Sequence, residues 1–193
     1  DMSFSGNLTI DEGATVTNQA TIDMTGRNST ITVNGVLDSS ATNSEVEFTY
    51  NETDATSTVA NRNVNSTGQF IVPAETDLTT MSNATVNGAY YTNDDGEYIL
   101  TSFANAVAAM ADSDVKEVTV IGVISESGDV TVAGDEDSGV TGFTVSIAAD
   151  AKASLGNITI SNATISVDDE GELTANITGT YGTDASAATI QLN

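Results

Sequence analysis

The sequence predicts an all-β fold, a β-solenoid of stacked β-arches with one short amphipathic capping helix near residues 99–111. Three observations support this prediction. Thr alternates with Val, Ile or Leu over much of the chain, and this pattern favours half-buried strands. Residues 6–10 (GNLTI) and 156–160 (GNITI) nearly repeat each other, and acidic glycine turns follow strands at 11–13 and 168–171. Short strands joined by recurring turns are typical of stacked arches.

The spacing of equivalent strands gives the expected repeat length. In the second half of the chain, strand starts lie 25, 20 and 25 residues apart, at Val118, Phe143, Ala163 and Ala188. The starts at Leu8 and Ile31 in the first half lie 23 residues apart. One turn of a parallel β-solenoid takes about 20–25 residues. A β-sandwich also produces short strands about every 8–12 residues, and it is the alternative fold.

Residues 1–98 are expected to form an N-terminal β-arch region. Its predicted strands are punctuated by glycines: Leu8–Ile10, Thr15–Thr17, Thr21–Asp23, Ile31–Val33, Val46–Tyr50 and Phe70–Val72. Residues 51–69 are polar and contain a cluster of asparagines, so they are predicted to be an exposed loop. Residues 87–98 begin at an Asn-Gly pair and contain an Asn-Asp-Asp-Gly turn signal, and they are predicted to be a hairpin arm.

Residues 99–111 carry the only convincing helical pattern in the chain. Apolar side chains recur at helical spacing on one face: Leu100, Phe103, Ala104, Val107 and Met110. Thr101 or Ser102 is expected to cap the N-terminus, because a side-chain hydroxyl there accepts a hydrogen bond from a free backbone N–H group. The acidic segment 112–114 is expected to end the helix.

Strands are predicted again from the helix to the end of the chain: Val118–Ile121, Val130–Val132, Phe143–Ile147, Ile158–Ile160, Ala163–Val167, Leu173–Ile177 and Ala188–Leu192. With an amphipathic helix placed before these strands, residues 98–193 resemble a right-handed parallel β-helix domain of the pectate-lyase-like class. The resemblance implies that the helix covers the apolar side chains and unpaired backbone groups of the first turn. Residues 99–193 are therefore expected to be a helix-capped solenoid region that continues the first region as one structural unit.

The composition excludes several classes of function. Lys and Arg number 4 against 28 Asp and Glu, for a net charge of -24. Nucleic acid and anionic membrane surfaces both need clustered basic residues, so neither partner is expected. No apolar run approaches the roughly 20 residues that span a bilayer. The chain has no His and no Cys, which removes Ser-His triads and most metal-hydrolase sites. We therefore expect no enzyme activity and no catalytic cofactor.

Asn-x-Ser/Thr sequons indicate an extracellular protein with N-linked glycans. Eight are present, at Asn7, Asn28, Asn51, Asn65, Asn83, Asn157, Asn162 and Asn176. The alternative is that a β-protein rich in Thr and Asn produces sequons by chance. The sequence starts at Asp1 without an initiator Met, as expected if a signal peptide has been removed.

Acidic clusters in glycine-flanked turns are the only polar groups with the chemistry of a metal site. The candidate ligands are Asp135, Glu136, Asp137, Asp168, Asp169 and Glu170. Ca²⁺ takes six to eight oxygen ligands and tolerates irregular geometry, so carboxylates on turns suit it. The alternative is that these side chains are ordinary solvated turn residues.

The chain as a whole is acidic, rich in Thr and Asn, sequon-bearing and free of Cys. In these respects it resembles archaeal cell-surface proteins, of which S-layer proteins and the sheath proteins of methanogens are the nearest. The resemblance implies a self-assembling structural subunit of an extracellular layer, sheath or filament, a homopolymer held together by strand edges. The expected edge residues are Leu8, Ile10, Ile190 and Leu192. Either the edges stack laterally, or the segment Phe4–Ile10 inserts into the next subunit.

Two other classes of function stay open. One is a monomeric adhesin or carbohydrate-binding module, in which Tyr90 and Tyr91 would stack on a sugar. The third hypothesis is a β-helix enzyme that acts on polysaccharide. Lyases of that class need basic residues to neutralise a uronate, and this chain offers only four scattered ones, Arg27, Arg62, Lys116 and Lys152.

Overall fold

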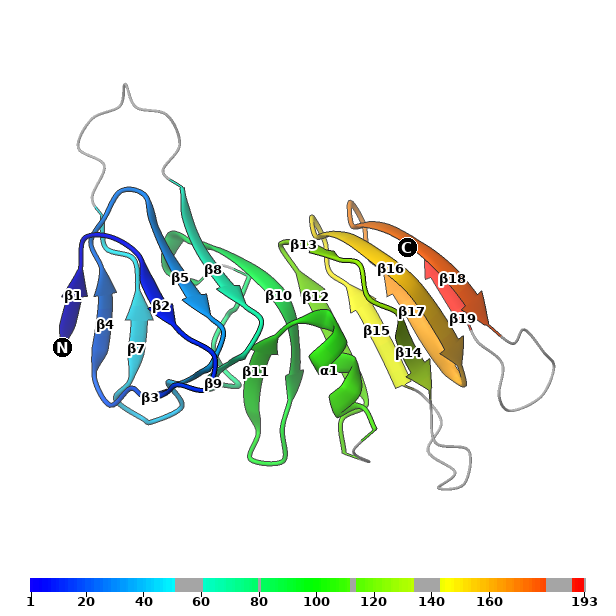
Figure 1. Cartoon of the computed structure of the whole chain (residues 1–193), viewed down its shortest axis with the longest axis horizontal. Helices are drawn as coiled ribbons and strands as arrows, with labels where there is room; N and C mark the ends of the chain where they lie inside the picture. The colour runs from blue at the N-terminus through cyan, green and yellow to red at the C-terminus, as the bar shows by residue number, and fades with distance from the viewer. Residues whose placement is uncertain (51–60, 80, 112–113, 134–142, 180–188, 193) are drawn as a thin grey trace. The chain divides into compact units, whose positions relative to one another are not determined.

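The computed structural model describes residues 1–50, 61–79, 81–111, 114–133, 143–179 and 189–192 (Figure 1). The protein is mostly β, with one short α-helix in these residues, so the all-β prediction is confirmed. The chain divides into two compact units. The first comprises Asp1–Asn87 with Gly96–Leu100, and the second comprises Gly88–Asp95 with Thr101–Asn193.

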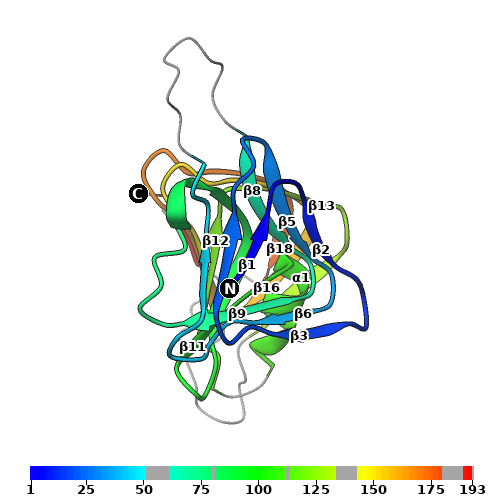
Figure 2. The ribbon, with the colours of Figure 1, turned by 90° about the vertical axis from the view of Figure 1, so that its left-hand side faces the viewer.

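Three parallel ladders of strands build the first unit; Figure 1 shows the strands of the first ladder side by side, and Figure 2 shows members of the second and third. Strands β1 (Met2–Phe4), β4 (Thr21–Met24) and β7 (Glu45–Glu47) form one ladder. The second ladder contains β2 (Leu8–Ile10), β5 (Ser29–Val33), β8 (Arg62–Ser66) and the start of β10 (Thr85–Thr92). The third contains β3 (Thr15–Thr17), β6 (Val36–Asp38) and β9 (Gln69–Pro73), and β11 (Glu97–Thr101) pairs antiparallel with β9. A short 3-10 helix, η1, spans Met81–Asn83.

The register of these ladders aligns like residues from strand to strand. Leu8 lies opposite Ile31, and Ile31 lies opposite Val64. Ile31 and Val64 are fully buried, whereas the residues that alternate with them point outward. This alternation is the period-two pattern that the sequence showed, and it keeps one column of apolar side chains inside each ladder.

Glycines stand where consecutive strands turn from one ladder to the next. The backbone N–H groups of Asn34 and Gly35 both donate to the carbonyl oxygen of Ile10, at 2.8 and 3.1 Å. One layer further, Thr67 and Gly68 repeat the arrangement on Val33, both at 2.9 Å. A Cβ atom on Gly68 would collide with the carbonyl oxygen of Gly35, so the turns stack at a distance that excludes a side chain.

The second unit also consists of parallel ladders. Strands β12 (Glu117–Ile121), β15 (Phe143–Ile147), β17 (Ala163–Val167) and β19 (Thr189–Leu192) pair in this order. The long strand β16 (Lys152–Ser161) pairs through its first half with β13 (Val123–Glu126) and through its second half with β14 (Val130–Ala133). On its other side β16 pairs with β18 (Glu172–Gly179). The end of β10 joins this unit as an antiparallel neighbour of β12.

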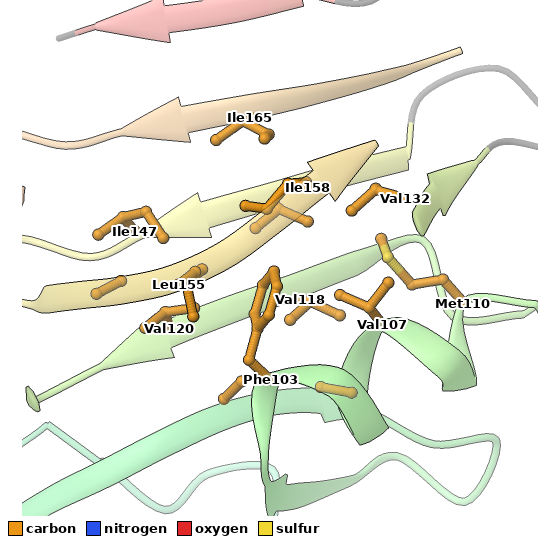
Figure 3. Close-up of a cluster of buried hydrophobic side chains, with 14 of the residues drawn as sticks. Phe103, Val107, Met110, Val118, Val120, Val132, Ile147, Leu155, Ile158 and Ile165 are labelled. Atoms are coloured by element: carbon orange, nitrogen blue, oxygen red, sulfur yellow. The ribbon is translucent and has the colours of Figure 1, made fainter. Parts of the chain in front are cut away.

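Helix α1 (Phe103–Ala109) packs against the first strands of the second unit, β12 and β14. Figure 3 shows Phe103, Val107 and Met110 in the same buried cluster as Val118, Val120 and Val132 of those strands. All three of these helix-side residues are less than 5 % exposed. The Ser102 side chain accepts a hydrogen bond from the backbone N–H of Asn105, so one of the two predicted caps is confirmed.

The helix is shorter than predicted. Residues 99–111 were expected to be helical, but Ile99 and Leu100 belong to β11, where Leu100 pairs with Phe70. Ala104, expected on the apolar face, is exposed. The prediction failed because a buried strand end and a helical stripe both place apolar residues at Ile99, Leu100 and Phe103, and periodicity cannot separate them over one turn.

The prediction of an exposed loop over residues 51–69 is also wrong for the second part of that range. Residues 62–66 form β8, an interior strand between β5 and β10, while 51–60 lie outside the described residues. Two of the asparagines that suggested a loop, Asn63 and Asn65, occupy outward positions of this strand. Only Val64 and Ser66 are buried, and the Ser66 hydroxyl donates to the Leu100 carbonyl at 2.9 Å.

Candidate functional site

The N-terminal strands of the first unit end its three ladders. Within the described residues, β1 pairs only with β4, β2 only with β5, and β3 only with β6. These strands are also the most exposed of their ladders. Met2 is 46 % exposed and Leu8 is half-buried, whereas Ile31, the neighbour of Leu8, is fully buried. The outer backbone edges of β1, β2 and β3 therefore have no strand partner in the part of the chain that is described.

The C-terminal strands end the ladders of the second unit in the same way. Among the described residues, β18 pairs only with β16 and β19 only with β17. Ile177 of β18 is half-buried, whereas Ile158, its partner in β16, is 1 % exposed. The side chains of β18 alternate between exposed and half-buried along its whole length.

The four predicted edge residues all lie in these terminal strands. Leu8 and Ile10 are in β2, where Ile10 is buried in the unit's own core. Ile190 and Leu192 are in β19, in register with Ile165 and Val167. The edge of β2 therefore offers a partner mainly backbone groups, with Leu8 as its accessible apolar side chain.

The start of the second unit is covered instead. Helix α1 lies on β12 and β14, and the carboxylate of Glu126 in β13 holds the helix N-terminus. Glu126 Oε1 accepts from the backbone N–H of Phe103 at 2.6 Å, and Oε2 accepts from that of Ala104 at 3.1 Å. A negative group placed there satisfies free N–H groups and interacts favourably with the helix dipole.

A ladder of polar side chains runs along the outside of β14, β16 and β18. Asn157 Nδ2 donates to Asp129 Oδ1 at 2.7 Å, and Asn176 Nδ2 donates to Asn157 Oδ1 at 3.2 Å. The hydroxyl oxygens of Thr159 and Thr178 lie 3.4 Å apart in the same layers. The sequence marked Asn157 and Asn176 as sequons, and residues 156–160 as a near-repeat of residues 6–10, but it did not predict these bonds between layers. The repeated Asn-x-Thr spacing between paired strands was the signal that sequence reasoning missed.

Asparagines bond between layers in the first unit as well. Asn7 Oδ1 accepts from the backbone N–H of Thr30 at 3.0 Å, and Asn28 Oδ1 accepts from that of Asn61 at 3.2 Å. Asn65 Oδ1 accepts from Asn87 Nδ2 at 2.9 Å. Stacked amides of this kind stabilise in-register parallel strands.

The predicted glycosylation sites differ in accessibility. Asn7, Asn28, Asn83, Asn157 and Asn176 are exposed, Asn65 is half-buried, and Asn51 lies outside the described residues. Asn162 is 8 % exposed and has a positive φ of 48°, in the tight turn between β16 and β17. A buried amide in a constrained turn is a poor acceptor for a glycan, so Asn162 is the weakest of the eight candidates.

Only half of the predicted Ca²⁺ ligands lie in the described residues. Asp135, Glu136 and Asp137 lie outside the described residues. Asp168, Asp169 and Glu170 form the turn between β17 and β18, in which the Gly171 N–H donates to the Asp168 carbonyl at 2.9 Å. Across the described residues, no group of three or more acidic side chains converges on one point. Ca²⁺ binding stays a prediction.

A different pair of carboxylates meets on the outer face of the first unit. Asp23 of β4 lies opposite Glu47 of β7, and Asp23 accepts a hydrogen bond from the Thr49 hydroxyl. Partial burial, followed by the negative charges of Glu45 and Asp23, raises the pKa of Glu47 above its ordinary value of 4.5. Parallel in-register strands thus place like charges next to each other.

The first unit also contains a hollow of about 340 Å³ with a mixed polar and apolar lining. Its lining residues are Ser39, Ser44, Glu45, Val46, Val72, Pro73, Thr76, Asp77 and Met81. Neither tyrosine of the predicted sugar-stacking pair belongs to this lining; Tyr90 and Tyr91 are half-buried in β10. The hollow therefore lacks the aromatic surface on which sugars stack.

Comparison with known proteins identifies no relative: no family model, no curated protein and no solved structure matches the chain. The described residues contain no helix with the length and apolar character of a membrane span.

Proposed function

We propose that this chain is a structural subunit of an extracellular cell-surface layer, sheath or filament, and that copies of it associate through their strand edges into a homopolymer. The finer architecture belongs to the same proposal. Each unit is a stack of β-arches, a short solenoid, whose terminal layers pair with those of neighbouring molecules.

The strand pairing supports a stack of arches over a sandwich. Consecutive strands such as β2 and β3 do not pair with each other; each pairs in parallel with a strand one layer on. A sandwich is built mainly from antiparallel neighbours. The layers are also bonded at their turns and through asparagine side chains, as expected where one layer repeats the next.

The observation that carries the assembly proposal is that the outer edges of the terminal strands have no strand partner among the described residues. An exposed strand edge presents a row of free N–H and C=O groups that pairs with another chain unless it is protected. Protection usually comes from Lys, Pro, a bulge or a covering element. Strands β1, β2 and β3 contain neither Lys nor Pro, and none of the α-helical residues described in the structure belongs to the first unit.

The charge of the chain makes assembly dependent on salt. A net charge of -24 repels identical molecules, and this repulsion weakens as the ionic strength rises. Divalent cations would bridge carboxylates of neighbouring molecules and act at lower concentration. The proposed location on the cell exterior agrees with the exposed sequons at Asn28 and Asn83, which would carry N-linked glycans on the outer surface of the polymer.

Assembly is tested by raising the salt concentration of purified monomer. We expect sedimentation velocity to show monomer at low ionic strength and large species at high NaCl or with added Ca²⁺, with negative-stain images showing sheets or filaments. EDTA should reverse the assembly induced by Ca²⁺ but not the assembly induced by NaCl. Monomer under all these conditions would contradict the proposal, and glycan binding by that monomer would favour an adhesin instead.

A further inference from the structure

We propose that assembly is head to tail and has a defined register. In this register β2 of one molecule extends the ladder of β18 in the next, with Asn7 opposite Asn176, Leu8 opposite Ile177 and Thr9 opposite Thr178. The inference rests on the proposed function and specifies the contact through which it would work. The partner is a second copy of this chain.

The first argument is a sequence motif that occurs at both edges. Residues 157–159 (NIT) and 176–178 (NIT) are in-register neighbours in β16 and β18. Residues 7–9 (NLT) carry the same motif into β2, the strand that opens the second ladder of the first unit. A third copy stacked on β18 would continue columns of Asn, aliphatic and Thr side chains that β16 and β18 already form.

The second argument is the direction of the side-chain hydrogen bonds. In the ladder from Asp129 to Asn176, each Nδ2 donates to the oxygen of the preceding layer. The last member, Asn176, uses its Nδ2 and keeps its Oδ1 as an acceptor. Asn7 uses its Oδ1 to accept from Thr30 within its own unit and keeps its Nδ2 as a donor. Among the described residues, the donor left over at one edge thus matches the acceptor left over at the other.

The third argument is the apolar residue between the two polar ones. Ile158, inside the ladder, is 1 % exposed, whereas Ile177, at its end, is half-buried. Leu8 at the opposite edge is also half-buried, although its neighbour Ile31 is fully buried. Placing Leu8 over Ile177 would remove apolar surface of both residues from water, which favours association.

The fourth argument is the order of strands along the chain. The second unit ends with the first half of β18, the second half of β18 and then β19. The first unit begins with β1, β2 and β3, and all of these strands belong to parallel ladders. If β2 lies on the second half of β18, then β1 follows the first half and β3 follows β19. One register thus offers each of the three opening strands a partner.

A competing register follows from the acidic turns. Residues 10–13 resemble residues 167–171, and this alignment would place β2 over β19, with Thr9 opposite Gln191. It does not use the free amide of Asn7 or the free oxygen of Asn176. We therefore favour the register on β18, and the experiment includes the competing one.

Cysteine cross-linking distinguishes these registers because the chain has no Cys of its own. Thr9→Cys and Thr178→Cys are prepared as separate variants, both at exposed positions. Neighbouring strands lie about 4.8 Å apart, within the Cα separation that a disulfide spans. After the two variants are mixed, assembled in high salt and oxidised, covalent dimers should appear on a non-reducing gel. We expect at least a fivefold excess over either variant alone, with wild-type-like assembly under reducing conditions.

Each other outcome is decisive. Dimers from one variant alone would indicate a symmetric contact, and dimers from Thr9→Cys with Gln191→Cys would indicate the competing register; both overturn the inference. Polymers without cross-links in the mixture overturn the register but leave the proposed function in place. If the wild-type chain forms no polymers at all, the proposed function itself fails.

A second variant tests the register without cross-linking. Asn7→Asp keeps the oxygen that accepts from Thr30 but removes the amide donor offered to Asn176. We expect the concentration needed for assembly to rise about tenfold while the thermal unfolding of the monomer is unchanged. Asn28→Asp is the matched control, because it makes the same charge change at an amide whose oxygen bonds Asn61 inside the first unit. Equal effects of the two variants would contradict the register.

Discussion

The two units differ in whether another element covers their first strands. In the second unit the end of β10 pairs with β12, and α1 covers β12 and β14 with Phe103, Val107 and Met110. The described part of the first unit opens with β1, β2 and β3, and no α-helix belongs to it. A covered first layer stops a ladder from growing, whereas an uncovered one leaves backbone groups available to another molecule. The chain thus contains one protected and one open beginning.

The protected beginning should depend most on Phe103, the fully buried anchor of α1. Phe103→Ala should lower the free energy of unfolding by about 3–5 kcal/mol, because it leaves a cavity between the helix and the strands. Leu8→Ala at the open beginning should cost only about 1 kcal/mol, because Leu8 is half-buried. Chemical denaturation of both variants under monomeric conditions measures the contrast. Similar losses at the two positions would mean that the first layers are equally protected.

The next contrast lies between the interior and the start of one ladder. A Cβ atom at Gly156 would lie 2.6 Å from the carbonyl oxygens of Ser127 and Gly128, so a side chain there forces two turns apart. Gly156→Ala should therefore destabilise the protein by about 2–4 kcal/mol. A Cβ atom at Gly128, one layer earlier, meets nothing within 4 Å, and Gly128→Ala is the matched control. Thermal unfolding should separate the two variants clearly; equal unfolding temperatures would show that the turns are not closely stacked.

These residues also show what the sequence could and could not predict. The strands Phe143–Ile147 and Ala163–Val167 were predicted to their ends, because alternating β-branched residues and flanking turns are local signals. The cap at Ser102 was local as well. Strand β8 was missed because its asparagines form hydrogen bonds between layers. The bond between Asn65 and Asn87 depends on which strands lie next to each other, and the sequence of one segment does not show this. Glu126, 23 residues from Phe103, was missed for the same reason.

Glu126 provides a second test of the protected beginning. Glu126→Gln replaces one of the two acceptor oxygens by an amide nitrogen and removes the charge that faces the helix dipole. The free energy of unfolding should fall by about 1–2 kcal/mol, similar to the effect of removing a helix cap. Glu12→Gln, in an exposed turn of the first unit, is the control for the charge change alone. Equal unfolding free energies for the two variants would show that the carboxylate contributes little to holding α1.

The smallest effect concerns the first unit, where parallel register places Glu47 next to Asp23. Because partial burial and the neighbouring negative charges raise the pKa of Glu47, its ionised form is less favourable in the folded protein than in the unfolded chain. Ionised Glu47 therefore lowers stability near neutral pH. This penalty is lost as the pH falls through the raised pKa, and it is absent below the ordinary value of 4.5, where Glu47 is mostly protonated in both states.

Glu47→Gln removes the ionisation and should raise the unfolding temperature at pH 7 by about 1–2 °C. The difference from the wild type should shrink to nothing as the pH approaches 4, because both side chains are then neutral. Thermal unfolding by circular dichroism at several pH values, under monomeric conditions, measures both parts, with Glu12→Gln as the control. A variant less stable than the wild type at pH 7 would mean that Glu47 has favourable partners that outweigh its repulsion from Asp23. In that case the acidic outer face of the first unit would not lower the stability of the monomer. The salt dependence of assembly would then come only from charge repulsion between different molecules.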